Sequence, residues 1–169
     1  MKEYLWRLLA KFVSQPLVAD YLIKRAKRTP YFHLDGYMNR WWLFNRYSEI
    51  GKMDRVKPRF SWLPSIRIHQ ILRKDNAEHL HDHPWDARTI ILKGWYCETR
   101  ENGINYAMLS GDTRPIKFGE YHSINYVSQW DIGVYTMFIT WKYVGTWGFL
   151  VDGKKIEHNQ YLTEHPERS

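Results

Sequence analysis

The first thirty residues place their apolar side chains at helical spacing. Within residues 2–14 the apolar positions recur three or four residues apart, which predicts a first helix there. Pro16 suits the first turn of a second helix, which we expect to run to about Arg28. The side chains expected to face inward from this second helix are Leu17, Tyr21, Leu22 and Ala26. The pattern therefore predicts an amphipathic helix pair that covers one face of the domain.

From about residue 40 the pattern changes to short segments rich in β-branched and aromatic residues. Strands are expected at residues 40–45, 65–73, 88–99, 104–109, 114–118, 122–126, 134–141, 147–151 and 154–157. Turn residues separate them, and Asp152-Gly153 is typical of a two-residue hairpin. Many short strands at this spacing indicate an antiparallel sandwich or barrel. We expect a basic helical segment at 1–60 packed on a barrel at 61–162, with a frayed polar tail at 163–169.

Composition supports a folded globular chain. Hydrophobic residues make up 44% of the 169 residues and aromatic residues 17%. Nine tryptophans and twelve tyrosines predict an aromatic-lined cavity, a large partner surface or thick aromatic packing between sheets. The single cysteine, Cys97, excludes an internal disulfide. No apolar run reaches the roughly 18 residues that a membrane span needs, and no secretory signal pattern is present. A cytoplasmic location is the expectation.

The positive charge is concentrated at one end of the sequence. Residues 1–60 hold 13 Lys and Arg against 5 Asp and Glu, whereas residues 61–169 hold 12 against 13. Such asymmetry can serve binding to nucleic acid, to an anionic membrane surface or to an acidic partner. More often, such asymmetry is only a solvated helix face.

The candidate chemistry is concentrated in residues 78–86, Glu-His-Leu-His-Asp-His-Pro-Trp-Asp. His79, His81 and His83 occupy alternate positions, so on an extended strand their imidazoles leave the same face. Neutral imidazole is the commonest protein ligand for zinc, iron, nickel and copper. The run therefore predicts a metal site.

The run His81-Asp82-His83, with Gly94 after it and Gly119-Glu120-Tyr121-His122 further on, resembles the two motifs of the cupin superfamily. The longer string His-Asp-His-Pro-Trp is similar to a poorly characterised branch of small bacterial and phage cupin-like proteins. The resemblance covers roughly residues 60–152. It implies a mainly β, double-stranded β-helix or jelly-roll barrel, with His81, His83 and His122 as ligands of a metal inside it.

The sequence departs from the cupin pattern at one position. Where the first motif usually has a glutamate ligand, this chain has Ala87, which carries no donor atom. Either three histidines hold the metal and leave positions open, or Asp86 supplies a carboxylate from a bulged strand. The divalent metal best suited to such a set is Fe(II), with zinc, nickel or manganese as alternatives.

Several nearby residues are candidates for further roles. His79 is either an alternative ligand or a catalytic acid or base, and Asp86 is the second catalytic candidate. Arg88 and Arg114 can clamp a substrate carboxylate or phosphate through paired hydrogen bonds. The aromatic residues expected near the substrate are Trp85, Tyr96 and Tyr121.

The sequence is compatible with three functions. The first is a metal-dependent enzyme acting on a small polar molecule, as a dioxygenase or as a Lewis-acid isomerase, epimerase or lyase. The second is a non-catalytic module that binds a small ligand. The third is an interaction protein that uses its basic N-terminal segment, and the aromatic content also makes a homodimer an expected form.

Overall fold

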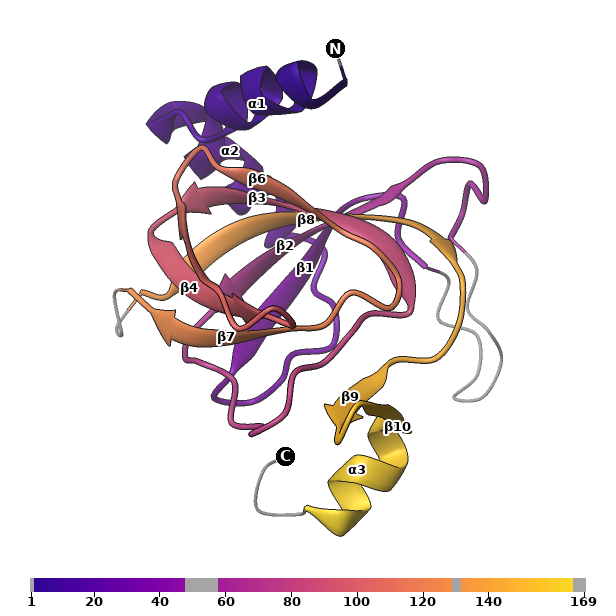
Figure 1. Ribbon diagram of the computed structural model, residues 1–169. Helices are drawn as coiled ribbons and strands as arrows, with labels where there is room; N and C mark the ends of the chain where they lie inside the picture. The colour runs from indigo at the N-terminus through magenta and orange to yellow at the C-terminus, as the bar shows by residue number, and fades with distance from the viewer. Residues whose placement is uncertain (1, 48–57, 129–131, 166–169) are drawn as a thin grey trace.

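The computed structural model describes residues 2–47, 58–128 and 132–165 (Figure 1). Two helices, α1 (Lys2–Val13) and α2 (Pro16–Ala26), precede the strands, and α3 (His158–Glu164) follows them. The strands are β1 (Met38–Phe44), β2 (Ser65–Ile71), β3 (Trp85–Lys93), β4 (Trp95–Arg100), β5 (Asn105–Leu109), β6 (Thr113–Ile116), β7 (His122–Val127), β8 (Val134–Tyr143), β9 (Gly148–Val151) and β10 (Lys154–Glu157). None of the helices in the described ranges is long and apolar enough to cross a membrane.

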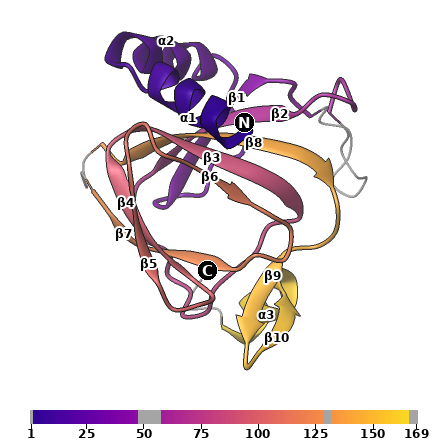
Figure 2. The ribbon, with the colours of Figure 1, turned by 45° about the horizontal axis from the view of Figure 1, so that its top comes forward.

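The strands form two opposed sheets and a terminal hairpin, which confirms the predicted mainly β, jelly-roll class. One sheet has the order β1-β2-β8-β3-β6, and the other has the order β5-β4-β7. All pairs between named strands are antiparallel. Figure 2 shows the two sheets facing each other, with the β9–β10 hairpin and α3 at one end. The strand β1 comes from the segment before residue 60 that we predict to be basic and helical.

The five-stranded sheet has a helix-covered face and a face directed into the barrel. Alternate side chains of a strand point to opposite faces. Ile68, Ile90 and Met137 belong to the apolar cluster that packs under α1 and α2. The side chains one position away, such as those of Arg67, Thr89 and Phe138, line the interior instead. The second face therefore carries polar groups, and these form the site described below.

The helix pair covers the sheet as predicted, but the inward face of α2 is only partly the predicted one. Leu17 is 86% exposed and Tyr21 is 68% exposed. The buried residues of α2 are Ala19, Ile23 and the predicted Ala26, and the predicted Leu22 packs partly buried against the same cluster. The face that contacts the sheet is thus rotated from the predicted one, so Ala19 and Ile23 are buried in place of Leu17 and Tyr21. The exposed fractions thus correct the expectation for Leu17 and Tyr21.

Glycine geometry accounts for two connections. The segment predicted as one strand over residues 88–99 is divided at Gly94, which has a φ of +77°. This left-handed conformation favours glycine and lets β3 and β4 enter different sheets. The predicted Asp152-Gly153 hairpin is confirmed, with positive φ at both residues. The helix α3, which the pattern did not predict, reaches into the tail expected to be frayed.

Candidate metal centre

The histidines predicted as ligands, His81, His83 and His122, lie together inside the barrel. One ligand atom from each lies within 4.8 Å of the others. His81 and His122 exchange two backbone hydrogen bonds of 2.9 Å, so main-chain pairing fixes their relative position. His83 follows His81 by two residues in the sequence, and its Nε2 is 3.0 Å from Nε2 of His122. Residues 78–84 are not a regular strand, since only His81 makes bridges, to His122 and Phe149.

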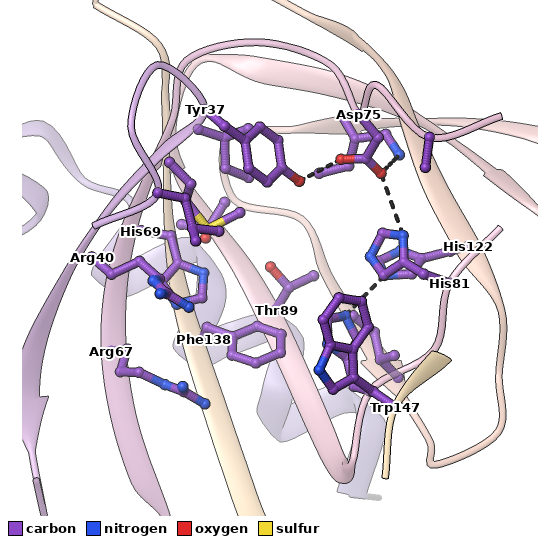
Figure 3. A pocket seen from close by; sticks show the side chains of 18 of the residues that line it. Tyr37, Arg40, Arg67, His69, Asp75, His81, Thr89, His122, Phe138 and Trp147 are labelled. Carbon is purple, nitrogen blue, oxygen red and sulfur yellow. Dashed lines mark hydrogen bonds and ion pairs between the residues drawn. The ribbon is translucent and has the colours of Figure 1, made fainter. Parts of the chain in front are cut away.

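Two of these histidines, His122 and His81, each have a buried carboxylate near the Nδ1 atom. Glu98 of β4 is 0% exposed, and its Oε2 lies 3.2 Å from Nδ1 of His122. Asp75 Oδ2 lies 3.6 Å from Nδ1 of His81, as Figure 3 shows. A carboxylate at Nδ1 holds the proton there and leaves Nε2 free to bind a metal. This pairing is typical of metal-binding histidines.

The two carboxylates are themselves fixed by hydrogen bonds. Asp75 accepts one from the Tyr37 hydroxyl and one, of 2.8 Å, from the backbone N–H of Ile124. Glu98 accepts hydrogen bonds of 3.0 and 2.8 Å from Arg100. Burial raises the pKa of Glu98, but the hydrogen bonds from His122 and Arg100 outweigh it and hold this pKa below its ordinary value. Glu98 therefore stays ionised at neutral pH.

Burial also keeps two of the imidazoles in the form that binds metals. It lowers the pKa of His81 to about 4, although Asp75 raises it in part. The pKa of His83 is held well below its ordinary value by burial and then by the neighbouring His122 and His81. Both rings are neutral at pH 7, and a neutral imidazole offers a lone pair to a metal ion.

The spacing of one pair of nitrogens fits a single metal ion. Two nitrogens bonded to one metal at about 2.1 Å and at right angles are about 3.0 Å apart. The His83 and His122 Nε2 atoms show this separation, 3.0 Å. Among the described residues no carboxylate or cysteine joins the three histidines as a further ligand. Ala87, at the usual glutamate position, is buried against Ile116 and Phe138.

The histidines open onto a cavity of about 890 Å³ between the two sheets. This volume is in the range of sites for small molecules. Trp85 and Tyr96, predicted to contact a substrate, both line it. Figure 3 shows the imidazoles of His81 and His122 on one side of the cavity and Arg40, Arg67 and His69 on the other. The cavity thus has a histidine end and a cationic end.

The structure places the two predicted catalytic residues away from the histidine cluster. Nδ1 of His79 is 3.0 Å from the hydroxyl of Tyr161 in α3, and the two rings pack edge to face. Asp86 is exposed, and its Oδ1 accepts a hydrogen bond of 3.0 Å from the backbone N–H of Phe118. Asp86 has the strand parity opposite to that of Ala87, which explains why it does not replace the missing glutamate.

Three of the predicted substrate-binding residues also lie elsewhere. Arg88 points to the helix side of β3, where it pairs with Glu3 of α1 at 2.6 Å. The Arg114 guanidinium stacks on Tyr106 at 3.8 Å and lies 3.6 Å from Glu98. Tyr121 does not line the cavity. The strand phase explains Arg88, because it alternates with Ala87 and Thr89, which face inward.

The sequence pattern missed the carboxylates that hold the histidines. Glu98 is preceded two residues earlier by the buried Tyr96, so it occupies an inward position on β4. The alternation of the sequence is enough to place this charged residue on the inward face, so Glu98 could have been recognised as a candidate. Asp75 carries no comparable signal, because it lies in a connection outside the strands. Asp82 is fully buried but binds Gly148 N–H and Lys155 rather than the cluster.

Comparison with known proteins gives matches through structure only. No protein-family model matches the sequence, and no curated protein does. The DMSP lyase DddQ from Ruegeria pomeroyi DSS-3 superposes with a TM-score of 0.50 at 14% identity, over 81% of this chain and 71% of that one. This neighbour and others found with it are cupin-type proteins. The chain has a cupin fold.

Two further neighbours have TM-scores below 0.5. A cupin-like protein (TM1010) from Thermotoga maritima MSB8 has a TM-score of 0.46 at 13% identity, over 80% of this chain and 92% of that one. FeII HppE has a TM-score of 0.44 at 7% identity, over 62% of this cupin. The match covers only about half of two of these proteins. This chain spans 50% of the length of HppE and 47% of the length of a further DMSP lyase structure. At 14% identity the likeness to DddQ shows the fold alone, and this fold is the one that the cupin resemblance of the sequence implies.

Proposed function

We propose that this cupin is a metal-dependent enzyme that acts on a small polar molecule. His81, His83 and His122 hold a divalent metal ion, and the cavity beside them admits the substrate. The observation that carries the proposal is the arrangement of the imidazoles, two of which have a carboxylate near Nδ1 and all of which place a ligand atom within 4.8 Å of the others. A cluster formed only by packing has no need of these orienting carboxylates.

The ligand set favours direct coordination of substrate. Three protein ligands leave positions open on a metal that prefers five or six, and an open position marks a catalytic site rather than a structural one. A metal bound here would supply Lewis-acid polarisation of a substrate oxygen or, as Fe(II), the activation of dioxygen. The chain's own contribution is to orient the imidazoles through Asp75 and Glu98 and to enclose the substrate in an aromatic-walled cavity.

Metal analysis of the protein tests the proposal. Anaerobically purified wild-type protein, reconstituted separately with Fe(II), Zn(II), Ni(II) and Mn(II), is expected to retain about one equivalent of at least one of them. His122→Gln should lose this metal. His79→Gln is the matched control, because His79 bonds Tyr161 outside the cluster and its loss should leave the metal content unchanged.

Two outcomes of this experiment contradict the proposal. One is wild-type protein that retains less than about a tenth of an equivalent of any of the four metals. The other is a His122→Gln variant that binds as much metal as the wild type and the His79→Gln control.

A further inference from the structure

The end of the cavity opposite the metal ligands is formed by cationic and hydrogen-bond-donating side chains. Arg67 and His69 lie two residues apart on β2 and so share its inner face. Arg40 of β1 lies directly across from His69 in the strand register. All three line the cavity, and Figure 3 shows them on the side away from His81 and His122. This group is called the cationic end below.

Arg67 is buried without a counter-ion among the described residues. It is 2% exposed, and its one hydrogen bond there, to Thr140 Oγ1, is long at 3.4 Å. Its guanidinium lies between 4.8 and 5.9 Å from the centres of four aromatic rings, those of Tyr31, Trp42, Trp85 and Phe138. Burial lowers the pKa of Arg67 to about 10, so the group is still charged at neutral pH. A buried, unpaired cation is unfavourable unless an anion compensates it.

Unsatisfied polar atoms gather at this same end. Four buried side-chain nitrogens of the described residues have no hydrogen-bond partner. Three of them, Nε of Arg67, Nε2 of His69 and Nε1 of Trp85, belong to residues that line this cavity. Buried polar groups are nearly always paired in folded proteins, so three unpaired nitrogens in one place indicate a missing partner. Arginine and indole N–H groups are donors only, which means that the partner is an acceptor.

The carboxylates that line the cavity do not fill this role. Asp75 is engaged by Tyr37, by the backbone of Ile124 and by His81. Asp35 is exposed to solvent, and no ion pair joins it to Arg67 or Arg40 within the described ranges. The net charge of the cationic end is therefore positive.

We propose that the cationic end binds the carboxylate or phosphoryl group of a small organic anion. Arg67 is the main anchor, with Arg40, His69 and Trp85 as further contacts, and the other end of the same molecule reaches the histidine cluster. The contact of the molecule with the histidine cluster rests on the proposed function, whereas the anion subsite itself does not require a metal. It assigns a substrate class, small organic acids or phosphorylated small molecules.

The geometry also limits the length of the molecule. The Phe138 ring centre lies 5.5 Å from Cζ of Arg67 and 5.4 Å from the centre of the His83 ring, so those two groups are at most about 11 Å apart. A molecule with an anionic group at one end and a metal-binding oxygen or sulfur a few bonds away spans that separation. A large polymer or a long acyl chain does not match it.

Anion binding by metal-free protein tests this subsite independently of the metal. Protein treated with chelator is titrated by calorimetry at constant ionic strength with inorganic phosphate, methylphosphonate and succinate, and with the neutral compound glycerol. We expect saturable binding of at least one anion and none of glycerol. The comparison of phosphate and methylphosphonate with succinate shows which anionic group the site takes.

The test variant is Arg67→Met, and the matched control is Arg88→Met. Both replace an arginine buried in the same sheet, but Arg88 faces α1. Arg67→Met should weaken anion binding at least tenfold, while Arg88→Met should leave it unchanged. If Arg67→Met does not fold, Arg40→Met, at a half-buried position of the same end, should weaken binding severalfold.

The outcomes separate this subsite from the proposed metal centre. Metal content that is unchanged in Arg67→Met, together with lost anion binding, is the expected result. No saturable anion binding by the wild type, or equal binding by the Arg67 and Arg88 variants, overturns the subsite even if the metal is present. Anion binding by a wild-type protein that retains no metal after reconstitution overturns the proposed function and leaves the subsite standing.

Discussion

At the scale of single residues, the site depends on pairs of a carboxylate and an imidazole. Glu98 holds His122 through Nδ1 and is held in turn by Arg100, so one buried chain of contacts fixes the direction of Nε2. Asp75 Oδ2 lies 3.6 Å from Nδ1 of His81, an electrostatic contact that is longer than a hydrogen bond. Such partners orient the ring and increase its basicity toward a metal. The affinity for metal should therefore respond to residues that never touch it.

The variant Glu98→Gln tests this relation. An amide keeps the shape of the side chain but loses the negative charge that orients His122. We expect the metal dissociation constant to rise about 10- to 100-fold, as measured by competition with a chromophoric chelator. Glu120→Gln is the control, because Glu120 is exposed and lies 3.9 Å from the same Arg100. Equal affinities for both variants and the wild type would count against an orienting role for Glu98.

The low pKa values of His81 and His83 predict how the stability of the metal-free protein depends on pH. Their pKa values in the folded state lie below the ordinary value of about 6.5 that applies to the unfolded chain. The unfolded chain therefore binds more protons between about pH 6.5 and 4, and stability falls as the pH drops through this range. Each imidazole contributes a slope of up to about 1.4 kcal/mol per pH unit.

Urea unfolding of metal-free protein at pH 7 and pH 5 measures this slope. The double variant His81→Asn/His83→Asn should show a smaller loss of stability between the two pH values than the wild type. A slope that is the same in both proteins would show that these imidazoles do not titrate differently on folding.

At the scale of elements, strand phase decides which predicted residues reach the cavity. On β3, Ala87 and Thr89 face inward, while Asp86 and Arg88 face outward. The sequence shows the alternation but not which phase faces the barrel, because helices cover the other face and bury it as well. The same ambiguity explains α2, whose small residues rather than Leu17 and Tyr21 face the sheet.

The hairpin of β9 and β10 and the helix α3 form an element that closes one end of the cavity. Trp147, directly before β9, and Leu162 of α3 both line the cavity. Tyr161 anchors α3, since it is 0% exposed, stacks on Phe149 at 3.9 Å and bonds His79. The packing of one aromatic side chain thus connects this unit to the segment that carries the histidines.

Tyr161→Ala should therefore loosen the C-terminal unit. Removing a fully buried aromatic ring costs about 3–5 kcal/mol through lost contacts and the cavity left behind. Chemical denaturation and amide hydrogen exchange in α3 and β10 measure the effect. Tyr21→Ala is the control, because Tyr21 is 68% exposed and its loss should change stability by less than about 0.5 kcal/mol. Similar losses in both variants would contradict the anchoring role.

At the scale of the whole molecule, the barrel brings together residues that are far apart in the sequence. Turn signals predicted an antiparallel sandwich or barrel, and the resemblance to the two cupin motifs implied the jelly-roll fold and the meeting of His81 and His83 with His122. The orienting carboxylates and the cationic end were not predictable in this way. Arg40 and His69 meet only through the pairing of β1 with β2, and a charge pattern along the chain does not reveal which strands pair.

The structure also shows where some of the positive charge of the basic N-terminal segment lies. Part of its positive charge is turned inward, since Arg40 lines the cavity. Binding of nucleic acid, the formation of a homodimer and a cytoplasmic location stay predictions. In the proposed anion subsite, Arg40 has a use inside the barrel that needs no macromolecular partner.

The most direct test of the metal centre is a crystal structure of the reconstituted protein, with anomalous difference maps recorded on both sides of the absorption edge of the bound metal. The account predicts one strong peak within bonding distance, about 2.0–2.2 Å, of nitrogens from His81, His83 and His122. Its remaining ligands should be solvent or substrate rather than protein carboxylates. A peak at another position, or no peak in protein that retains the metal, would contradict the central claim.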